Sequence, residues 1–221
     1  MKSFPLFLVK QMPAIKIKAS DRVAFIGKTG SGKTELAKFF LSMLNRVLVI
    51  DTKHTFKMEG FKKSWSIPFI SKSFRLIVRP KRSEDEKLLE LLEQANREKN
   101  LTIYIDELST LTEYFPESTA YLADIVRTGR EKRVAVWSGM QRPRGTPRVF
   151  LSETETFFCF SLRAREDREY IKGFAGDEVM LRIPRFNFWY IPADDESATL
   201  MMLDTNKQVI KTIAKEVIPD A

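Results

Sequence analysis

Short apolar runs alternate with longer amphipathic stretches along the chain. A run that is apolar on both faces predicts a strand buried on both sides of a sheet. The stretches between these runs repeat apolar residues every three or four positions, which is the period of an α-helix. The predicted strands cover residues 23–26, 46–51, 74–78, 101–105, 133–141 and 155–162, and the predicted helices cover residues 34–44, 84–100, 117–128 and 165–173.

This alternation predicts an α/β fold with helices on both faces of a mainly parallel sheet. A chain of 221 residues is long enough to bury one such core. No internal repeat or flexible linker divides it, so we expect a single domain over residues 1–221. Within this domain we expect an N-terminal arm at 1–20, the main core at 20–165 and a C-terminal extension of helix and hairpin at 166–221.

Finer patterns complete the expected secondary structure. Residues 14–19 alternate apolar and basic side chains, which predicts a half-exposed strand. Ser83 and Glu86 have the spacing of a capping box at the start of a helix. The predictions near the C-terminus are strands at 186–191 and 199–203, a polar turn at 193–197 between them, and an amphipathic helix at 206–217.

Residues 27–34 read Gly-Lys-Thr-Gly-Ser-Gly-Lys-Thr, the complete pattern G-x-x-x-x-G-K-[ST] of a phosphate-binding loop. In such a loop the backbone N–H groups surround a polyphosphate, the lysine reaches its outer phosphates, and the last hydroxyl ligates Mg²⁺. A flexible glycine-rich turn is the alternative, but the motif stands between a predicted strand and a predicted helix, as a phosphate loop requires. The residues expected to bind the nucleotide are Gly27, Thr29, Gly30, Ser31, Gly32, Lys33 and Thr34.

Ligands of parallel α/β sheets bind at the carboxyl ends of the strands. This rule brings Thr34, Asp51, Asp106 and Gln141 to one edge, around one nucleotide. Asp106 follows a buried strand and is expected to hold Mg²⁺ together with Thr34, partly through water. Glu107 beside it could orient and deprotonate the attacking water. The alternative is that this acidic pair only favours the start of the next helix.

Gln141 ends the strand predicted at 133–141. Its side-chain amide could bond both the γ-phosphate and the attacking water, and so sense whether the triphosphate is intact. An ordinary polar loop residue is the alternative interpretation.

Basic residues crowd the segment 127–148, which holds seven of them and one acid, Glu131. A solvated basic face is one interpretation. In the other, one arginine reaches the nucleotide of a neighbouring subunit and stabilises the charge of the departing phosphate. Arg142, Arg144 and Arg148 on the following loop could contact a nucleic-acid backbone without reading its bases.

Composition limits the expected partners, metal sites and cellular location. The net charge of +8 favours a polyanionic partner, although charge alone also serves solubility. The single cysteine, Cys159, stands in an apolar run and is interpreted as a core residue, and the single histidine, His54, as a loop residue, so no Cys/His metal cluster is expected. No apolar run has the length of a transmembrane helix and no cleavage site follows the N-terminal apolar residues, so we expect a cytoplasmic protein that is not secreted.

Together these motifs resemble the FtsK–HerA superfamily of P-loop DNA translocases over roughly residues 20–165. The matching segments are GKTGSGKT at 27–34, VLVIDTK at 47–53, LTIYIDE at 101–107 and GREKRVAVWSGMQRP at 129–143. Two positions depart from the family pattern: Thr52 stands where proline is usual, and Met140 stands where threonine is usual.

The resemblance implies a three-layer RecA-like P-loop NTPase that hydrolyses ATP with Mg²⁺ and moves double-stranded DNA through a homo-oligomeric ring, a hexamer. Arg130 stands at the family's arginine position relative to Gln141 and is implied to act on the adjacent subunit's ATP, with Arg127 as the reserve and Arg133 also open. In size the chain is most similar to viral genome-packaging ATPases, which implies a capsid or membrane protein as docking partner.

Three alternatives stay open. A cellular or plasmid translocase of the HerA or conjugation type would carry the same motifs. A small nucleotide or metabolite kinase shares the phosphate loop, although Asp106, Glu107 and Gln141 suit activation of water better than transfer to an acceptor. A non-hydrolysing nucleotide-binding module would show no turnover even with long DNA.

Overall fold

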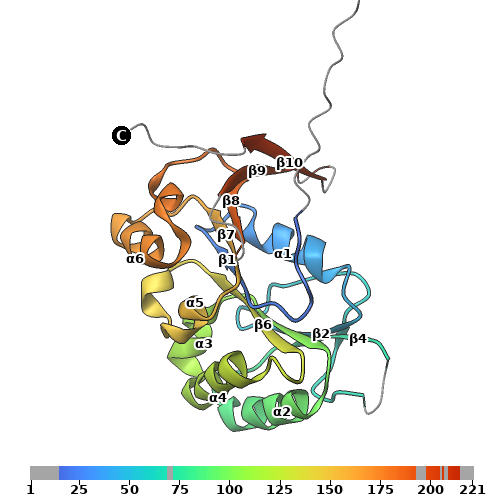
Figure 1. Ribbon diagram of the computed structural model, residues 1–221. Helices are drawn as coiled ribbons and strands as arrows, with labels where there is room; N and C mark the ends of the chain where they lie inside the picture. The colour runs from blue at the N-terminus through green and yellow to red at the C-terminus, as the bar shows by residue number, and fades with distance from the viewer. Residues whose placement is uncertain (1–14, 69–71, 193–197, 205, 207–208, 215–221) are drawn as a thin grey trace, which may run out of the picture.

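The computed structural model describes residues 15–68, 72–192, 198–204, 206 and 209–214. In this part of the chain the backbone forms a ten-stranded sheet in the order β10-β9-β8-β7-β1-β6-β5-β2-β4-β3 (Figure 1). The strands are β1 (Val23–Ile26), β2 (Arg46–Ile50), β3 (Lys62–Lys63), β4 (Phe74–Val78), β5 (Leu101–Ile105), β6 (Val134–Met140), β7 (Thr156–Phe160), β8 (Asn187–Pro192), β9 (Thr199–Asp204) and β10 (Val209–Ala214).

Most of the sheet is parallel. The strands from β3 across to β7 pair in parallel, while β8, β9 and β10 continue the same sheet in antiparallel pairs. The predicted mainly parallel sheet is therefore confirmed. We call the edge where β1, β2, β5, β6 and β7 end the carboxyl edge, and the edge where they begin the amino edge.

Helices cover both faces of the sheet, unequally (Figure 1). Within the described ranges, α1 (Lys33–Leu41) is the one helix on the first face, where it packs with loop segments around Ile17 and Phe56, and the other helices pack on the second face. This confirms the predicted three-layer α/β architecture. The helices of the second face are α2 (Asp85–Arg97), α3 (Leu108–Tyr114), α4 (Pro116–Thr128), α5 (Val149–Ser152) and α6 (Arg165–Ala175), and short 3₁₀ turns stand at η1 (Pro143–Gly145) and η2 (Asp177–Met180).

The alternation of side chains along a central strand explains why two cores form. In β1, Val23 and Phe25 point to the α1 side, where the Phe25 ring stacks on Phe158 at 5.1 Å between centroids. Ala24 and Ile26 point to the opposite core. Because successive residues of a strand face opposite sides of the sheet, a strand that is apolar throughout must be covered on both.

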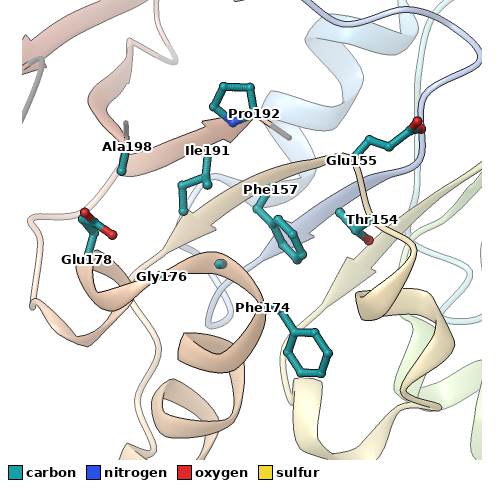
Figure 2. Close-up of a pocket in the computed structure, with 10 residues that line it drawn as sticks. Thr154, Glu155, Phe157, Phe174, Gly176, Glu178, Ile191, Pro192 and Ala198 are labelled. Atoms are coloured by element: carbon teal, nitrogen blue, oxygen red, sulfur yellow. The ribbon is translucent and has the colours of Figure 1, made fainter. Parts of the chain in front are cut away.

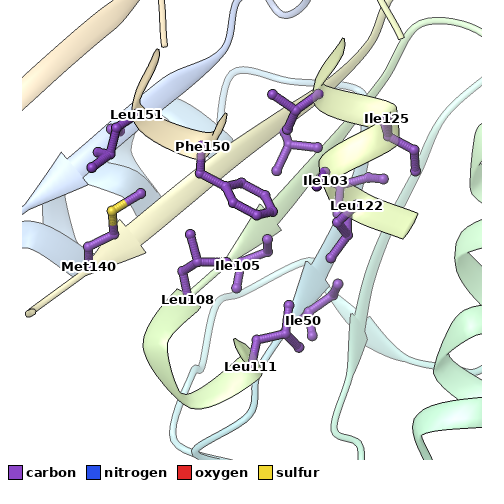
Figure 3. Close-up of a cluster of buried hydrophobic side chains, with 14 of the residues drawn as sticks. Ile50, Ile103, Ile105, Leu108, Leu111, Leu122, Ile125, Met140, Phe150 and Leu151 are labelled. Carbon is purple, nitrogen blue, oxygen red and sulfur yellow. The ribbon is translucent and has the colours of Figure 1, made fainter. Parts of the chain in front are cut away.

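Figure 3 shows the core under the helices of the second face. Leu108 of α3, Leu122 of α4 and Phe150 of α5 belong to the same core as Ile105 of β5, and all four side chains are buried. The sequence did not predict α3. Helix α3 begins directly after Glu107, and its buried residues Leu108 and Leu111 anchor it in this core. The core therefore also holds the backbone of Glu107, the candidate catalytic residue.

Two predictions near helix and strand starts are wrong. Residues 15–20 form no strand; the backbone N–H and C=O of Lys16 bond the Tyr190 hydroxyl, each at 3.3 Å, instead of a neighbouring strand. The capping box is also absent, because α2 begins at Asp85 with Glu84 at its N-cap and without a side-chain cap bond. The Asp85 carboxylate instead accepts the Glu117 and Ser118 N–H groups at the start of α4.

The amphipathic helix predicted at 206–217 is also wrong over its described part, because residues 209–214 form strand β10. β10 pairs antiparallel with β9, and its Val-Ile-Lys-Thr-Ile sequence is rich in the β-branched residues that fit a pleated sheet. The predicted strands at 186–191 and 199–203 are confirmed as β8 and β9. The predicted turn at 193–197 and arm residues 1–14 lie outside the described residues. None of the described helices is both long enough and apolar enough to span a membrane.

Candidate active site

The phosphate loop lies at the carboxyl edge, between the end of β1 and the start of α1. Gly27 N–H donates to the Met140 carbonyl at 3.0 Å, and Lys28 N–H donates to the Ser161 carbonyl at 3.3 Å. The loop is therefore tied to the ends of both β6 and β7. The predicted strand–loop–helix arrangement is present, and it directs the amino end of α1 toward the space where the phosphates of a nucleotide would lie.

Two glycines of the loop are needed for distinct reasons. Gly32 has φ of 107°, a left-handed conformation that side chains rarely adopt. At Gly27 a Cβ atom would lie 2.6 Å from the Cβ of Phe160, so only glycine lets the loop approach β7 this closely. Within the described part of the chain, the buried Ser31 Oγ has no hydrogen-bond partner. A free buried hydroxyl in this loop fits a site that binds a polar ligand.

Lys33 is buried, with 5% of its surface exposed. Its burial lowers the pKa of its ammonium group, while the nearby charges of Glu107 and Asp106 act in the opposite direction. The anionic phosphates of a nucleotide would stabilise the charged form further. The burial of a lysine beside two carboxylates is therefore suited to binding a polyphosphate.

Asp106 is held by two hydroxyl groups. Thr34 Oγ1 donates to Asp106 Oδ1 at 3.2 Å, and the Tyr104 hydroxyl donates to the same oxygen at 3.1 Å. Burial and then the Asp106 charge raise the pKa of Tyr104 well above its usual value, so Tyr104 remains a donor. The contact brings together the two residues predicted to hold Mg²⁺.

The donor set fits a magnesium ion bound together with a nucleotide. Among the described residues there is no group of three His, Cys, Asp or Glu side chains that could hold a metal. A P-loop magnesium ion does not need such a group, because phosphate oxygens and water supply most of its ligands. Thr34 and Asp106 would contribute the hydroxyl and the carboxylate.

Glu107 is almost completely buried, at 2% exposure, and in the part of the chain that the structure describes three groups donate to its carboxylate. Oε1 accepts the Ser109 hydroxyl at 2.8 Å and the Gln141 N–H at 3.1 Å, and Oε2 pairs with Lys53 Nζ at 3.0 Å. The side chain makes no capping bond to α3, although Glu107 stands at the N-cap of that helix. The carboxylate is therefore directed into the site, which disfavours the helix-start alternative.

Gln141 connects the phosphate loop to Glu107. Its side-chain oxygen accepts the Thr29 hydroxyl at 2.7 Å, while its backbone N–H donates to Glu107. The predicted grouping of Thr34, Asp106 and Gln141 at one edge is what the structure contains. A movement of Thr29 in the phosphate loop could therefore be transmitted to Glu107 through Gln141 alone.

Asp51 lies at the same edge but serves its own loop. Its fully buried carboxylate accepts the Thr55 N–H at 3.0 Å, the Phe56 N–H at 2.9 Å and Arg79 Nε at 2.8 Å. All of these partners belong to the chain around β2 and β4. Asp51 thus shapes the loop that carries Lys53. The sequence had predicted instead that Asp51 lies around the nucleotide.

The candidate finger arginines lie at the opposite, amino edge. Arg127 lies in the last turn of α4 and pairs with Asp124 at 2.9 Å, and Arg130 and Arg133 stand in the turn before β6. All three arginines are exposed. Gln141 follows the other end of β6, and a strand of this length spans about 23 Å. The structure therefore does not bring these arginines to the chain's own phosphate loop.

The candidate DNA-contacting arginines follow the carboxyl end of β6. Arg142 and Arg144 are exposed around the η1 turn. Arg148 is exposed too, and its guanidinium lies 5.4 Å from the centre of the Phe174 ring of α6. Arg142 and Arg144 therefore follow the carboxyl edge directly, and Arg148 lies against α6.

The phosphate loop makes two contacts with the C-terminal part of the chain that the sequence did not predict. Arg185 Nε donates to the Gly30 carbonyl at 2.9 Å. The Phe186 ring lies so close to Gly32 that a Cβ there would be 3.0 Å from Phe186 Cδ1. No local pattern links positions this far apart in the chain, and only the antiparallel return into β8 brings them to the carboxyl edge.

A separate pocket opens at the amino edge, between β7, β8, α6 and η2 (Figure 2). Phe157, Phe174 and Ile191 supply apolar lining, and Glu155 and Glu178 lie at opposite ends of it (Figure 2). The length of β7, about 17 Å, separates this pocket from the phosphate loop. It is therefore not part of the nucleotide site.

Comparison with known proteins gives the family. Residues 20–141 match the family model described as AAA domain. The chain belongs to this AAA domain family. No curated protein sequence matches the chain.

Several solved structures superpose on this AAA domain protein. The genome packaging NTPase B204 from Sulfolobus turreted icosahedral virus 2, in complex with AMPPCP, superposes with a TM-score of 0.61 at 16% identity over 91% of this chain and 100% of B204. The pCW3 conjugation coupling protein TcpA, with ATPγS, gives 0.61 at 16% identity over 84% and 61%. VirB4 of Thermoanaerobacter pseudethanolicus gives 0.60 at 10% identity over 92% and 93%.

These findings confirm the RecA-like P-loop fold, and they agree with the resemblance to FtsK–HerA-type ATPases that the motifs carry. With the AAA domain and the phosphate-loop geometry, they identify the chain as an ATP-binding P-loop ATPase.

Proposed function

We propose that the chain hydrolyses ATP to move double-stranded DNA and works as a homo-oligomeric ring, a hexamer, in packaging a viral genome. In this proposal Lys33 and the loop N–H groups hold the β- and γ-phosphates. Thr34 and Asp106 hold Mg²⁺, which stabilises the charge that develops on the phosphates. Glu107 accepts a proton from the attacking water, and Gln141 senses the γ-phosphate.

The observation that carries the ring proposal is the separation of two sets of residues across the sheet. Binding and water-activating groups gather at the carboxyl edge, whereas Arg127, Arg130 and Arg133 are exposed at the amino edge. An arginine in this position can reach a nucleotide only in another subunit. Arg130 is our candidate, with Arg127 and Arg133 as alternatives, and each site would then be completed by its neighbour.

Exposed basic side chains on the segment that follows β6 support DNA as the cargo. Arg142, Arg144 and Arg148 follow β6, and the whole chain carries a net charge of +8. Such side chains neutralise phosphates of any sequence and release bound counterions. We therefore propose contacts to the DNA backbone without base recognition.

Genome packaging is our preferred task because B204, a genome packaging NTPase, superposes over 100% of its own length on 91% of this chain. We propose that the chain works in the cytoplasm of the infected cell and docks on a capsid or membrane protein. A conjugation-type translocase is the second candidate, because the coupling protein TcpA superposes with the same TM-score. A kinase or a non-hydrolysing module is less favoured, since Glu107 and Gln141 meet where a water would be activated.

The test is the ATPase rate measured against added double-stranded DNA, with the particle mass measured in the same buffer with nucleotide. We expect duplex DNA to increase phosphate release and the mass to correspond to six chains. A monomer whose ATPase ignores DNA would contradict the proposal. Phosphate transfer to a small acceptor, without release in its absence, would favour the kinase.

A further inference from the structure

The middle of the phosphate loop has more conformational freedom than its first residues. The Gly27 and Lys28 N–H groups are bonded to carbonyl groups at the ends of β6 and β7. Further along the loop, Gly30 and Gly32 both have left-handed backbones, with φ of 73° and 107°. Glycine adopts such conformations readily, but it adopts many others as well. The middle of the loop therefore has the most entropy to lose when it closes around phosphates.

Two neighbouring residues of the turn before β8 contact these two glycines. Arg185 Nε donates to the Gly30 carbonyl at 2.9 Å. The Phe186 ring lies against Gly32, where a Cβ atom would be 3.0 Å from Phe186 Cδ1. The Arg185 guanidinium also lies 4.6 Å from the centre of the Phe186 ring, so the two side chains support each other. A single turn thus contacts both left-handed positions of the loop.

The backbone of this turn is strained and is held in place by its own hydrogen bonds. Phe186 has φ of 67°, which is rare for a bulky side chain. Its carbonyl accepts the Leu203 N–H of β9 at 2.9 Å, and the Asn187 N–H donates to the Pro184 carbonyl at 3.1 Å. Strained residues of this kind persist where the surrounding structure imposes them, and they gather at functional sites. Here the strain accompanies the placement of a ring on the phosphate loop.

The contact of Arg185 does not compete with a nucleotide. It uses a carbonyl oxygen of the loop, whereas phosphate oxygens accept hydrogen bonds from the N–H groups of the loop. Arg185 and a nucleotide can therefore bind the same loop at the same time. Arg185 is also exposed, so replacing its side chain leaves the cores of the protein intact.

We propose that Arg185 and Phe186 are positioning residues that hold Gly30 and Gly32 in the nucleotide-binding conformation before a nucleotide arrives. Holding the loop in this way reduces the entropy that it loses on binding, so affinity rises without any contact to the ligand. The antiparallel extension that begins at β8 is then part of the nucleotide site. This proposal rests on the proposed binding of ATP phosphates by the loop and is independent of DNA translocation.

The first test measures the affinities of ATPγS and ADP, each with Mg²⁺, by calorimetry on the full chain without DNA. Arg185→Met and Arg185→Gln are a matched pair of similar size, and the glutamine amide nitrogen stands at the same position along the side chain as Arg Nε. Arg185→Met should weaken both nucleotides about fivefold, the loss expected for one hydrogen bond. Both are affected because the loop N–H groups hold phosphates that both nucleotides contain. Arg185→Gln should restore most of the affinity.

Arg182→Met, which changes an exposed arginine shortly before the same turn, is the control and should bind as the wild type does. In ATPase assays Arg185→Met should raise KM by about the same factor as it weakens binding, with kcat unchanged. Equal affinities of the wild type and Arg185→Met would overturn the proposal. Equal weakening by Arg185→Met and Arg185→Gln would also overturn it, because the charge rather than the hydrogen bond would then matter.

A second test measures hydrogen exchange of the peptide that contains residues 29–33. Arg185→Met and Phe186→Ala should each speed its exchange in the free protein. Saturating ATPγS should return the rates to those of the wild type, because bound phosphates then hold the loop. Peptides from β5 should exchange at the wild-type rate in both variants. If Phe186→Ala does not fold, Phe186→Leu is judged by the same criteria.

Unchanged exchange of the loop peptide would contradict positioning by the turn. Faster exchange throughout the sheet would contradict it too, because Arg185 and Phe186 would then stabilise the whole fold rather than the loop. Failure of this inference differs from failure of the proposed function. A wild-type protein that binds no ATPγS would refute the nucleotide site itself, whereas this inference fails with wild-type binding intact.

Discussion

The two edges of the sheet differ in how their polar residues are held. At the carboxyl edge Asp106 and Glu107 are buried and bonded to side chains from several elements. At the amino edge Arg127, Arg130 and Arg133 are exposed at the end of α4 and in the turn before β6. The first arrangement is built to function within one chain. The second presents charge to whatever lies outside it.

Strand β6 joins the two edges. Gln141, which bonds both the phosphate loop and Glu107, follows its carboxyl end, and Arg133 precedes its amino end. The strand that contacts the chain's own nucleotide site therefore begins beside the arginines proposed to act on a neighbour's ATP. In the proposed ring, β6 would connect the two sites.

The largest effect is expected at the amino edge. Arg130→Ala should lower the ATPase rate about a thousandfold, the usual contribution of an arginine finger, with ATP affinity nearly unchanged. Phosphate release and ATPγS binding measure the two quantities. Arg127→Ala and Arg133→Ala are the matched variants, and whichever of the three has the largest loss identifies the finger. Small losses of ATPase rate in all three variants would mean that no arginine of the amino edge takes part in catalysis.

At the carboxyl edge, Glu107→Gln should lower turnover about a hundredfold or more while ATP binding stays near the wild-type value, because the amide cannot accept the proton of water. Single-turnover phosphate release and calorimetry test this. Near-normal hydrolysis by the variant would exclude Glu107 as the base.

Stability should also distinguish the two edges. Asp51→Asn leaves Arg79 without its buried anionic partner and should lower the free energy of unfolding by about 3 kcal/mol. Asp124→Asn breaks the exposed pair with Arg127 and should hardly change it. Urea unfolding of both variants provides the measurement. If Asp51→Asn lowered the free energy of unfolding as little as Asp124→Asn, the buried contacts of Asp51 would add no stability.

The smallest effect concerns the DNA. The double variant Arg142→Ala/Arg144→Ala should weaken duplex binding for all sequences alike and lower the slope of log affinity against log salt by about two, one for each lost phosphate contact. Fluorescence anisotropy at several salt concentrations measures this. An unchanged slope would move the DNA contacts to another surface.

The sequence predicted the carboxyl edge well because its signals are local. The phosphate loop is a contiguous motif, and Asp106, Glu107 and Gln141 each follow a recognisable buried strand. Since parallel strands end at a common edge, the strand pattern alone brings these residues together. The observed bonds of Thr34 to Asp106 and of Thr29 to Gln141 agree with that prediction.

What the sequence could not predict depends on long-range packing. The contact of Arg185 with Gly30 spans most of the chain, and the pairing of Lys53 with Glu107 depends on a loop shaped by buried Asp51. Asp85 caps α4 rather than its own helix for the same reason. Strand β10 has amphipathic spacing, but its pairing with β9 outweighs that pattern.

The most direct test of a site shared between subunits mixes two inactive proteins. Lys33→Ala lacks the nucleotide-binding lysine and Arg130→Ala lacks the proposed finger, so each alone should have almost no ATPase activity. In a hybrid ring some interfaces combine an intact phosphate loop with an intact Arg130 from its neighbour. We predict that mixing the two proteins restores part of the DNA-dependent ATPase rate, whereas no recovery at any mixing ratio would contradict the account.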